Sequence, residues 1–181
     1  MNFLKLFELD EYKMESQAVR VLSDLIIDRG YILDNKMCDE CIIEGHKDNE
    51  KILCFICDNE KLNIQGIKDR LSVMKRENAK RAIIIYRTSV TASAKKSLET
   101  IDNAIEIFSL EELQLNITQH RLVPKHERVT EDEKKMLESK YKGKLPLILS
   151  SDPVVRYYNF LRGEYLRITR KDGSIIYRFV K

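Results

Sequence analysis

The chain has 181 residues, which suits one large domain or two small ones with a real hydrophobic core. Charged residues make up 34% of the chain, and it holds only 6 Gly and 3 Pro, so its composition excludes a disordered protein. Residues 1–118 carry 17 Lys and Arg against 21 Asp and Glu, whereas residues 119–181 carry 15 against 8. Two halves of opposite charge predict two modules with different partners.

Neither a signal peptide nor a membrane span is expected. Charged residues interrupt the apolar stretch at the N-terminus, and no uncharged run is long enough to cross a bilayer. We therefore expect an intracellular protein whose four cysteines are reduced thiols or metal ligands and do not form disulfides.

The first 118 residues alternate between helical and strand-like patterns. Helices are predicted over 16–29, from 64 onward and from 92 onward, and strands over 52–57, 82–86 and 104–108. Ile64, Ile67, Leu71 and Met74 form the expected apolar stripe of the second helix, which Asn63 caps. The strand over 82–86 is apolar on both faces, as in a strand covered from both sides. The alternation predicts an α/β layer domain.

Residues 119–181 predict a small α+β domain. Thr130 and Glu133 form a capping box at the start of one helix. Asp152 and Pro153 start a second, short helix, which Asn159 can end in a left-handed conformation. Strands over 165–170 and 174–180 flank an Asp-Gly turn, so the domain is expected to end in a basic β-hairpin.

The four cysteines have the spacing of a zinc site. Cys38 and Cys41 form one pair and Cys54 and Cys57 another, and four thiolates spaced in this way can hold a structural zinc ion. However, Cys54 and Cys57 belong to a strand-like run, in which their side chains point to opposite faces of the sheet. This geometry favours buried thiols over a zinc site.

Other candidate sites have weaker patterns. His120 and His126 lie six residues apart, but no carboxylate or cysteine nearby completes a metal site. Asp58, Glu60 and Lys61 follow a strand, as in some metal-dependent nucleases, yet no second acid pairs with them, which favours a solvated turn.

The segment around Thr91 could bind phosphate. Thr91 can cap a helix whose free amides favour an anion, and Lys95 and Lys96 add positive charge one turn further on. The alternative is a solvated helix start with two surface lysines, which the charge pattern alone favours.

Five segments of the C-terminal half resemble one protein family in their order and spacing. They are HRLVPKH at 120–126, the capped helix at 130–141, Leu-Pro at 145–146, DPVVRY at 152–157 and the basic segment 162–170. This set resembles the assembly domain of a small subunit of cellular RNA polymerases. In eukaryotes it is the fifth subunit, shared by RNA polymerases I, II and III, and archaea have a shorter counterpart.

The first 118 residues are more loosely similar to the jaw domain of the eukaryotic subunit, which the archaeal counterpart lacks. The similarity is carried by 28–31, 57–58, 82–86 and 91–94. Ala92 replaces a proline of the family pattern, and Asn159 replaces a glycine. The hairpin tip at 171–174 is shorter than in the family, which puts contacts of the longer loop in doubt.

The resemblance implies a non-catalytic structural subunit of DNA-directed RNA polymerase, with a jaw domain at 1–118 and an assembly domain at 119–181. It implies docking on the largest subunit, contacts with other polymerase subunits, a position near downstream DNA and no cofactor, metal or membrane contact. The residues expected to shape the docking module are Pro124, His126, Asp152, Pro153, Arg156 and Tyr157. Those expected near DNA or a regulator are Thr91, Ser93, Lys95 and Lys96.

The implied location is the nucleus, while a viral origin with transcription in the host cytoplasm stays open. A different class of function is a free zinc-ribbon factor that binds nucleic acid, which predicts bound metal and salt-sensitive affinity. A nuclease is the third alternative, and it predicts metal-dependent cleavage.

Overall fold

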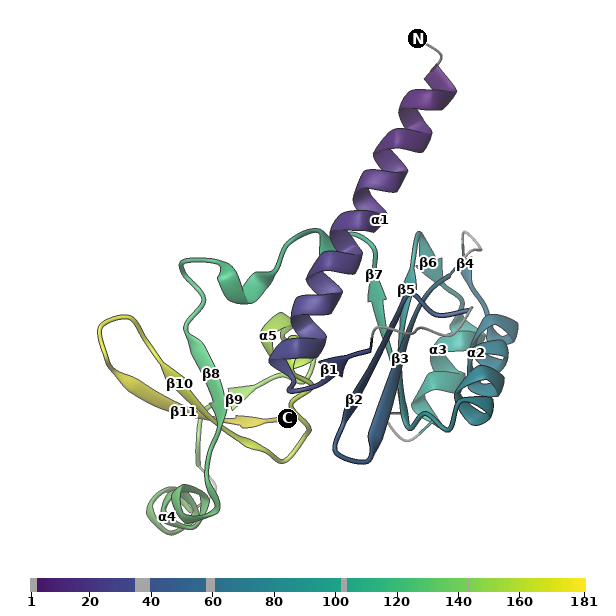
Figure 1. Ribbon diagram of the computed structural model, residues 1–181. Coiled ribbons are helices and arrows are strands. Elements are labelled where there is room, and N and C mark those ends of the chain that lie inside the picture. The colour runs from purple at the N-terminus through teal and green to yellow at the C-terminus, as the bar shows by residue number, and fades with distance from the viewer. Residues whose placement is uncertain (1–2, 35–39, 58–60, 102–103, 143) are drawn as a thin grey trace. The chain divides into compact units, whose positions relative to one another are not determined.

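The computed structural model describes residues 3–34, 40–57, 61–101, 104–142 and 144–181, with side chains from residue 13 onward (Figure 1). The chain forms two compact units, Met1–Leu115 and Asn116–Lys181. The division thus lies after Leu115, whereas the sequence placed it after residue 118. Both units combine helices with a β-sheet. No helix in the described part of the chain is long and apolar enough to cross a membrane.

A five-stranded sheet forms the centre of the N-terminal unit, in the order β1-β2-β3-β5-β7. The strands are β1 (Ile32–Leu33), β2 (Ile43–Lys47), β3 (Glu50–Ile56), β5 (Arg81–Tyr86) and β7 (Ile105–Ser109). β3, β5 and β7 are parallel, and β1 and β2 extend the sheet by antiparallel pairing. Residues 82–85 of β5 are all buried, which confirms the predicted strand covered on both faces. β4 (Lys61–Leu62) and β6 (Ser89–Val90) form a separate two-stranded sheet.

Helices cover both faces of this sheet (Figure 1). α2 (Ile64–Arg76) and α3 (Ala92–Glu99) lie on one face, where Ile67 and Ala94 join Leu53 and Phe55 of β3 in one core cluster. α1 (Phe3–Asp28) lies on the other face and buries Leu22, Leu25 and Ile26. The short 3-10 helix η1 (Glu112–Gln114) packs against α1.

Local capping rules were reliable predictors in this unit. The Asn63 side-chain oxygen accepts a hydrogen bond from the Gly66 amide at 2.8 Å, and the Thr91 hydroxyl accepts one from the Ala94 amide at 3.3 Å. Two details were wrong. The first helix begins at Phe3 and not at 16, and Ile64, placed in the apolar stripe, is 39% exposed because it is the first residue of α2.

A buried ion pair joins α1's end to the sheet. Arg29 donates one hydrogen bond from each terminal nitrogen to the two carboxylate oxygens of Glu106, at 2.7 and 2.8 Å. The two side chains are only 6% and 18% exposed. A two-pronged contact of this kind fixes geometry as well as charge, so it sets the position of α1's end over β7.

The C-terminal unit has a four-stranded sheet in the order β8-β10-β11-β9. The strands are β8 (Lys125–Arg128), β9 (Leu147–Ile148), β10 (Tyr165–Thr169) and β11 (Ile175–Val180), and the helices are η2 (Ile117–Gln119), α4 (Glu131–Tyr141) and α5 (Pro153–Tyr158). β10 and β11 form the predicted hairpin, with Gly173 at φ +80° in its turn. β9 pairs with β11 in parallel, so the sheet is mixed.

Charge contacts hold α4 against the sheet. The predicted capping box is present: the Thr130 hydroxyl accepts from the Glu133 amide, and the Glu133 carboxylate accepts from the Thr130 amide at 3.0 Å. Arg167 of β10 donates to Glu133 at 3.1 Å and to Glu127 of β8 at 3.3 Å. The Thr130 amide, together with the Arg167 charge, lowers the pKa of Glu133. Arg167 therefore connects helix and sheet.

Candidate functional site: a groove in the C-terminal unit

The short helix α5 starts as its sequence predicts. Asp152 accepts a hydrogen bond from the Val154 amide at 2.9 Å, and Pro153 occupies the first turn, where no amide donor is needed. Asn159 ends the helix at φ 50° and ψ 50°, in the left-handed conformation that asparagine tolerates. The DPVVRY motif therefore encodes a short helix with fixed ends.

This helix packs on one half of the sheet's face. Val155 joins Ile148, Phe160, Leu166 and Val180 in a buried cluster. Tyr157 is also buried, and its hydroxyl accepts a hydrogen bond from the buried Asn116 side chain at 3.2 Å. Tyr157 is therefore part of the interior of the unit.

The HRLVPKH segment leads into the edge strand β8. His126 pairs with Ile168 across the β8–β10 ladder, and its Nδ1 atom lies 2.9 Å from the Pro124 carbonyl oxygen. His120 Nδ1 instead accepts from the Leu122 amide at 3.3 Å. The two histidines thus serve separate local turns. Across the described residues, no three or more His, Cys, Asp or Glu side chains gather closely enough to hold a metal ion.

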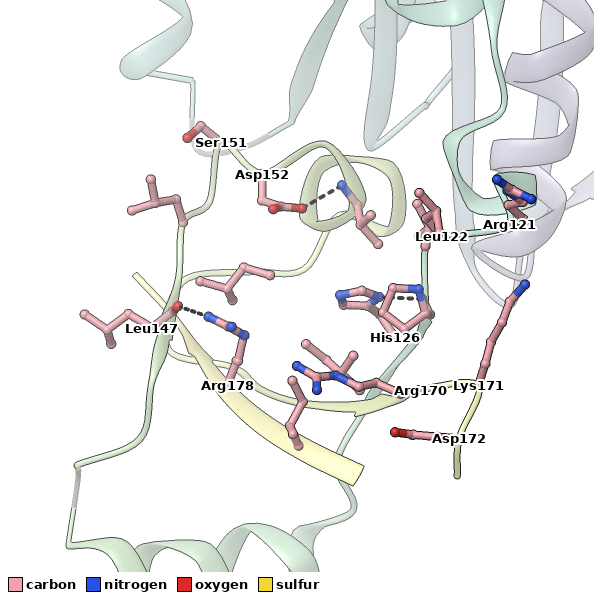
Figure 2. A pocket seen from close by; sticks show the side chains of 17 residues that line it. Arg121, Leu122, His126, Leu147, Ser151, Asp152, Arg170, Lys171, Asp172 and Arg178 are labelled. Atoms are coloured by element: carbon pink, nitrogen blue, oxygen red, sulfur yellow. Dashed lines mark hydrogen bonds between the residues drawn. The ribbon is translucent and has the colours of Figure 1, made fainter. Parts of the chain in front are cut away.

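A groove with a volume of about 910 Å³ opens on the half of the sheet that α5 leaves uncovered. Figure 2 shows His126, Arg170 and Arg178 around this hollow, with Leu122 on one side and Leu147 on the other. The groove brings together three of the predicted docking residues, namely Pro124, His126 and Asp152. Pro153, Arg156 and Tyr157 are not among the residues that line it.

The rim of the groove is basic. Arg121, Arg170, Lys171 and Arg178 carry positive charge there, against Asp152 and Asp172. The Asp152 carboxylate is engaged by the α5 amides, and Asp172 accepts from both the amide and the hydroxyl of Ser174. Those Ser174 hydrogen bonds lower the pKa of Asp172. Because both carboxylates have internal partners, the charge that faces a ligand is mainly positive.

The predicted DNA-proximal residues lie in the other unit. Thr91 caps α3, and its hydroxyl is 3.2 Å from that of Ser93. Ser93, Lys95 and Lys96 are all exposed. The structure therefore places these residues together at the start of one helix.

The cysteines divide between the faces of the N-terminal sheet. Cys41 and Cys57 pack in the core cluster under α2 and α3, whereas Cys54, one residue from Phe55 on β3, does not belong to that cluster. Burial raises the pKa of the Cys54 thiol well above its ordinary value, which disfavours the thiolate that a metal requires. Cys38 of the quartet, like Asp58 and Glu60, lies outside the described residues.

Sequence reasoning missed most of the groove. Leu122, Leu147, Arg170 and Arg178 come from four separate segments of the chain. One signal was present: Ile176, Arg178 and Val180 alternate along β11 and so share a face, on which only Val180 is fully buried. On this face Val180 belongs to the core, and Arg178 and Ile176 line the groove, so the arginine marks the boundary between the two.

Comparison with known proteins identifies the family. The model of the RNA polymerase Rpb5 C-terminal domain matches residues 115–180. "DNA-directed RNA polymerases I, II, and III subunit RPABC1" of Caenorhabditis briggsae is 31% identical over 207 residues, which covers 96% of this chain and 98% of the relative. The Caenorhabditis elegans protein of that name has the same identity and coverage. The Dictyostelium discoideum protein is 39% identical over 128 residues, 67% of this chain and 65% of the relative. The chain therefore belongs to the RPABC1 (Rpb5) family of RNA polymerase subunits.

Proposed function

We propose that this protein is a non-catalytic structural subunit of a multi-subunit DNA-directed RNA polymerase. One observation carries the proposal: relatives that align with 96% of the chain are named as a subunit of RNA polymerases I, II and III. Membership of this family favours neither the zinc-ribbon factor nor the nuclease. The proposed location is the nucleus, where polymerases of these three classes act.

The unit Asn116–Lys181 is the proposed assembly module, and its proposed partner is the largest polymerase subunit. Pro124, His126 and Asp152 line an open groove, and Pro153 and Arg156 lie on the adjoining α5, so a partner could contact this region as one surface. Tyr157 would support that surface from beneath, because it is buried against Asn116.

The unit Met1–Leu115 is the proposed jaw, near downstream DNA. Support comes from the start of α3, where Lys95 and Lys96 are exposed one turn into the helix. Positive side chains and helix amides both attract phosphate, which suits a position beside a nucleic acid or a phosphorylated regulator.

The docking proposal can be tested by sedimentation of cell extracts that contain tagged variants. Arg156→Glu should move the protein from the polymerase fraction to the free fraction, because a reversed charge repels a partner that is complementary to arginine. Lys135→Glu, the same charge reversal at an exposed position of α4, is the control and should stay with polymerase. If folded Arg156→Glu sediments with polymerase as the wild type does, the proposed docking surface is wrong.

A further inference from the structure

We propose that the groove of the C-terminal unit binds an extended peptide segment of a partner protein, one that combines apolar side chains with carboxylates. The inference rests on the proposed subunit function and deepens it, because it states the chemistry that the partner segment must have. Three features of the groove support it: its apolar walls, its basic rim and its position across the sheet.

The apolar walls are unusually open to solvent. Leu122 is 76% exposed and Leu149 59%, and both line the groove, which Leu147 borders with its backbone carbonyl. Ile168 and Ile176 of the hairpin form the floor between them. Large apolar side chains that gather in one exposed hollow are typical of a binding site, because their burial by a partner is favourable.

The basic rim selects the charge of the partner. The side chains of Arg121 and Lys171 form no ion pair with any residue in the described part of the chain, and Arg178 is bonded only to a neutral group, the Leu147 carbonyl, at 2.8 Å (Figure 2). The pKa of Asp172 is lowered mainly by the Ser174 hydrogen bonds and less by the charge of Arg170, so Asp172 is held by Ser174 first. Guanidinium groups with this freedom suit carboxylates, which they can bind through two hydrogen bonds.

The size of the groove favours a peptide in an extended conformation. Its lining includes residues of all four strands, from His126 on the edge strand β8 to Leu147 on the edge strand β9. Three gaps between neighbouring strands span roughly 14 Å, which is the length of about four residues of extended chain. A segment of this length would place alternate side chains on the floor and on the rim.

The lining argues for a peptide and against single-stranded nucleic acid. Phe, Tyr and Trp are absent from the described residues that line the groove, so the imidazole of His126 is the one aromatic ring among them, and a row of stacked bases lacks its usual platform. Apolar contact with leucines and charge contact with arginines together fit a protein segment.

The test uses the full chain and a phage-displayed library of random ten-residue peptides. Selection should enrich peptides that carry Leu, Ile or Phe together with Asp or Glu. The enriched peptides should bind Arg170→Glu/Lys171→Glu at least tenfold more weakly than wild type, and Leu149→Asp should weaken them as well. The double variant Lys134→Glu/Lys135→Glu on α4 changes the net charge equally, lies outside this groove and should bind as wild type does.

Several results would overturn the inference. The first is that selection does not enrich peptides with both acidic and apolar residues. The second is that the enriched peptides bind the groove variants as tightly as wild type. The third is that wild type binds a thymidine oligonucleotide and the groove variants do not. Failure of the subunit function is separate, because it is measured by recovery of polymerase with the tagged wild-type protein. If wild type co-purifies with polymerase but selects no such peptide, the groove proposal is refuted and the subunit function is not.

Discussion

The buried pair of Arg29 and Glu106 provides the sharpest test of how the N-terminal unit is held together. Glu106→Gln keeps the size of the side chain and one oxygen, but it removes the negative charge and turns an amide nitrogen toward the guanidinium. Arg29 is only 6% exposed, so water replaces the lost carboxylate poorly. The variant thus removes the carboxylate that binds this buried guanidinium through two hydrogen bonds.

The expected loss of stability is large. Removing one partner of a fully buried ion pair costs about 3–5 kcal/mol. Since Glu106 retains 18% exposure and glutamine keeps one acceptor, the lower end of this range applies, about 3 kcal/mol. For a unit of this size, such a loss lowers the Tm by roughly 10 °C.

Urea unfolding followed by far-UV circular dichroism measures this loss directly. The matched control is Glu40→Gln, which removes the same charge from the exposed pair of Glu40 with Arg76 and should leave the unfolding midpoint unchanged. If Glu106→Gln unfolded at the same urea concentration as this control, the interior pair would contribute nothing to the stability of the unit.

Three further predictions concern single side chains. Asp152→Ala removes the cap of α5 and should lower the free energy of unfolding by about 1–2 kcal/mol in urea. Tyr157→Phe leaves the Asn116 amide without the hydroxyl acceptor and should cost about 1 kcal/mol in the same assay. Cys54 should resist iodoacetamide at pH 8 in the folded protein and react after unfolding, because burial raises its pKa. The unfolded chain loses this proton at roughly pH 9 while the folded chain keeps it, so stability should fall above that pH.

Each of these predictions has a result that contradicts it. An unchanged midpoint for Asp152→Ala would show that Pro153 alone sets the start of α5. A stabilised Tyr157→Phe would mean that Asn116 finds another acceptor. Rapid alkylation of Cys54 in folded protein, identified by mass spectrometry, would mean that β3 opens readily at its centre.

The parts of the fold that depend on neighbouring residues were predictable. The caps at Asn63, Thr130 and Asp152 each need only a side chain and an amide two or three residues away, and all three are present. The central strand β5 was equally clear, because a run of apolar residues needs cover on both faces. Such features are determined by the residues of one short stretch of sequence.

The features that were missed depend on residues far apart in the chain. β2 has Gly45 at its centre and therefore weak strand propensity, and it forms because β3 pairs with it. Because glycine has no side chain, the Ile26 and Ile52 side chains can approach the β2 backbone at Gly45. The groove likewise joins Leu122, Leu149 and Arg170 only once the sheet has formed. The family resemblance predicted the docking residues of the groove, whereas only the structure revealed its apolar and basic lining.

The most direct test of the central claim is to tag the protein in its native cell, purify it gently and measure what accompanies it by quantitative mass spectrometry. The account predicts that the two large subunits of an RNA polymerase are recovered in a one-to-one ratio with the tagged protein. Recovery of the protein alone, above all with tightly bound zinc, would contradict the subunit function.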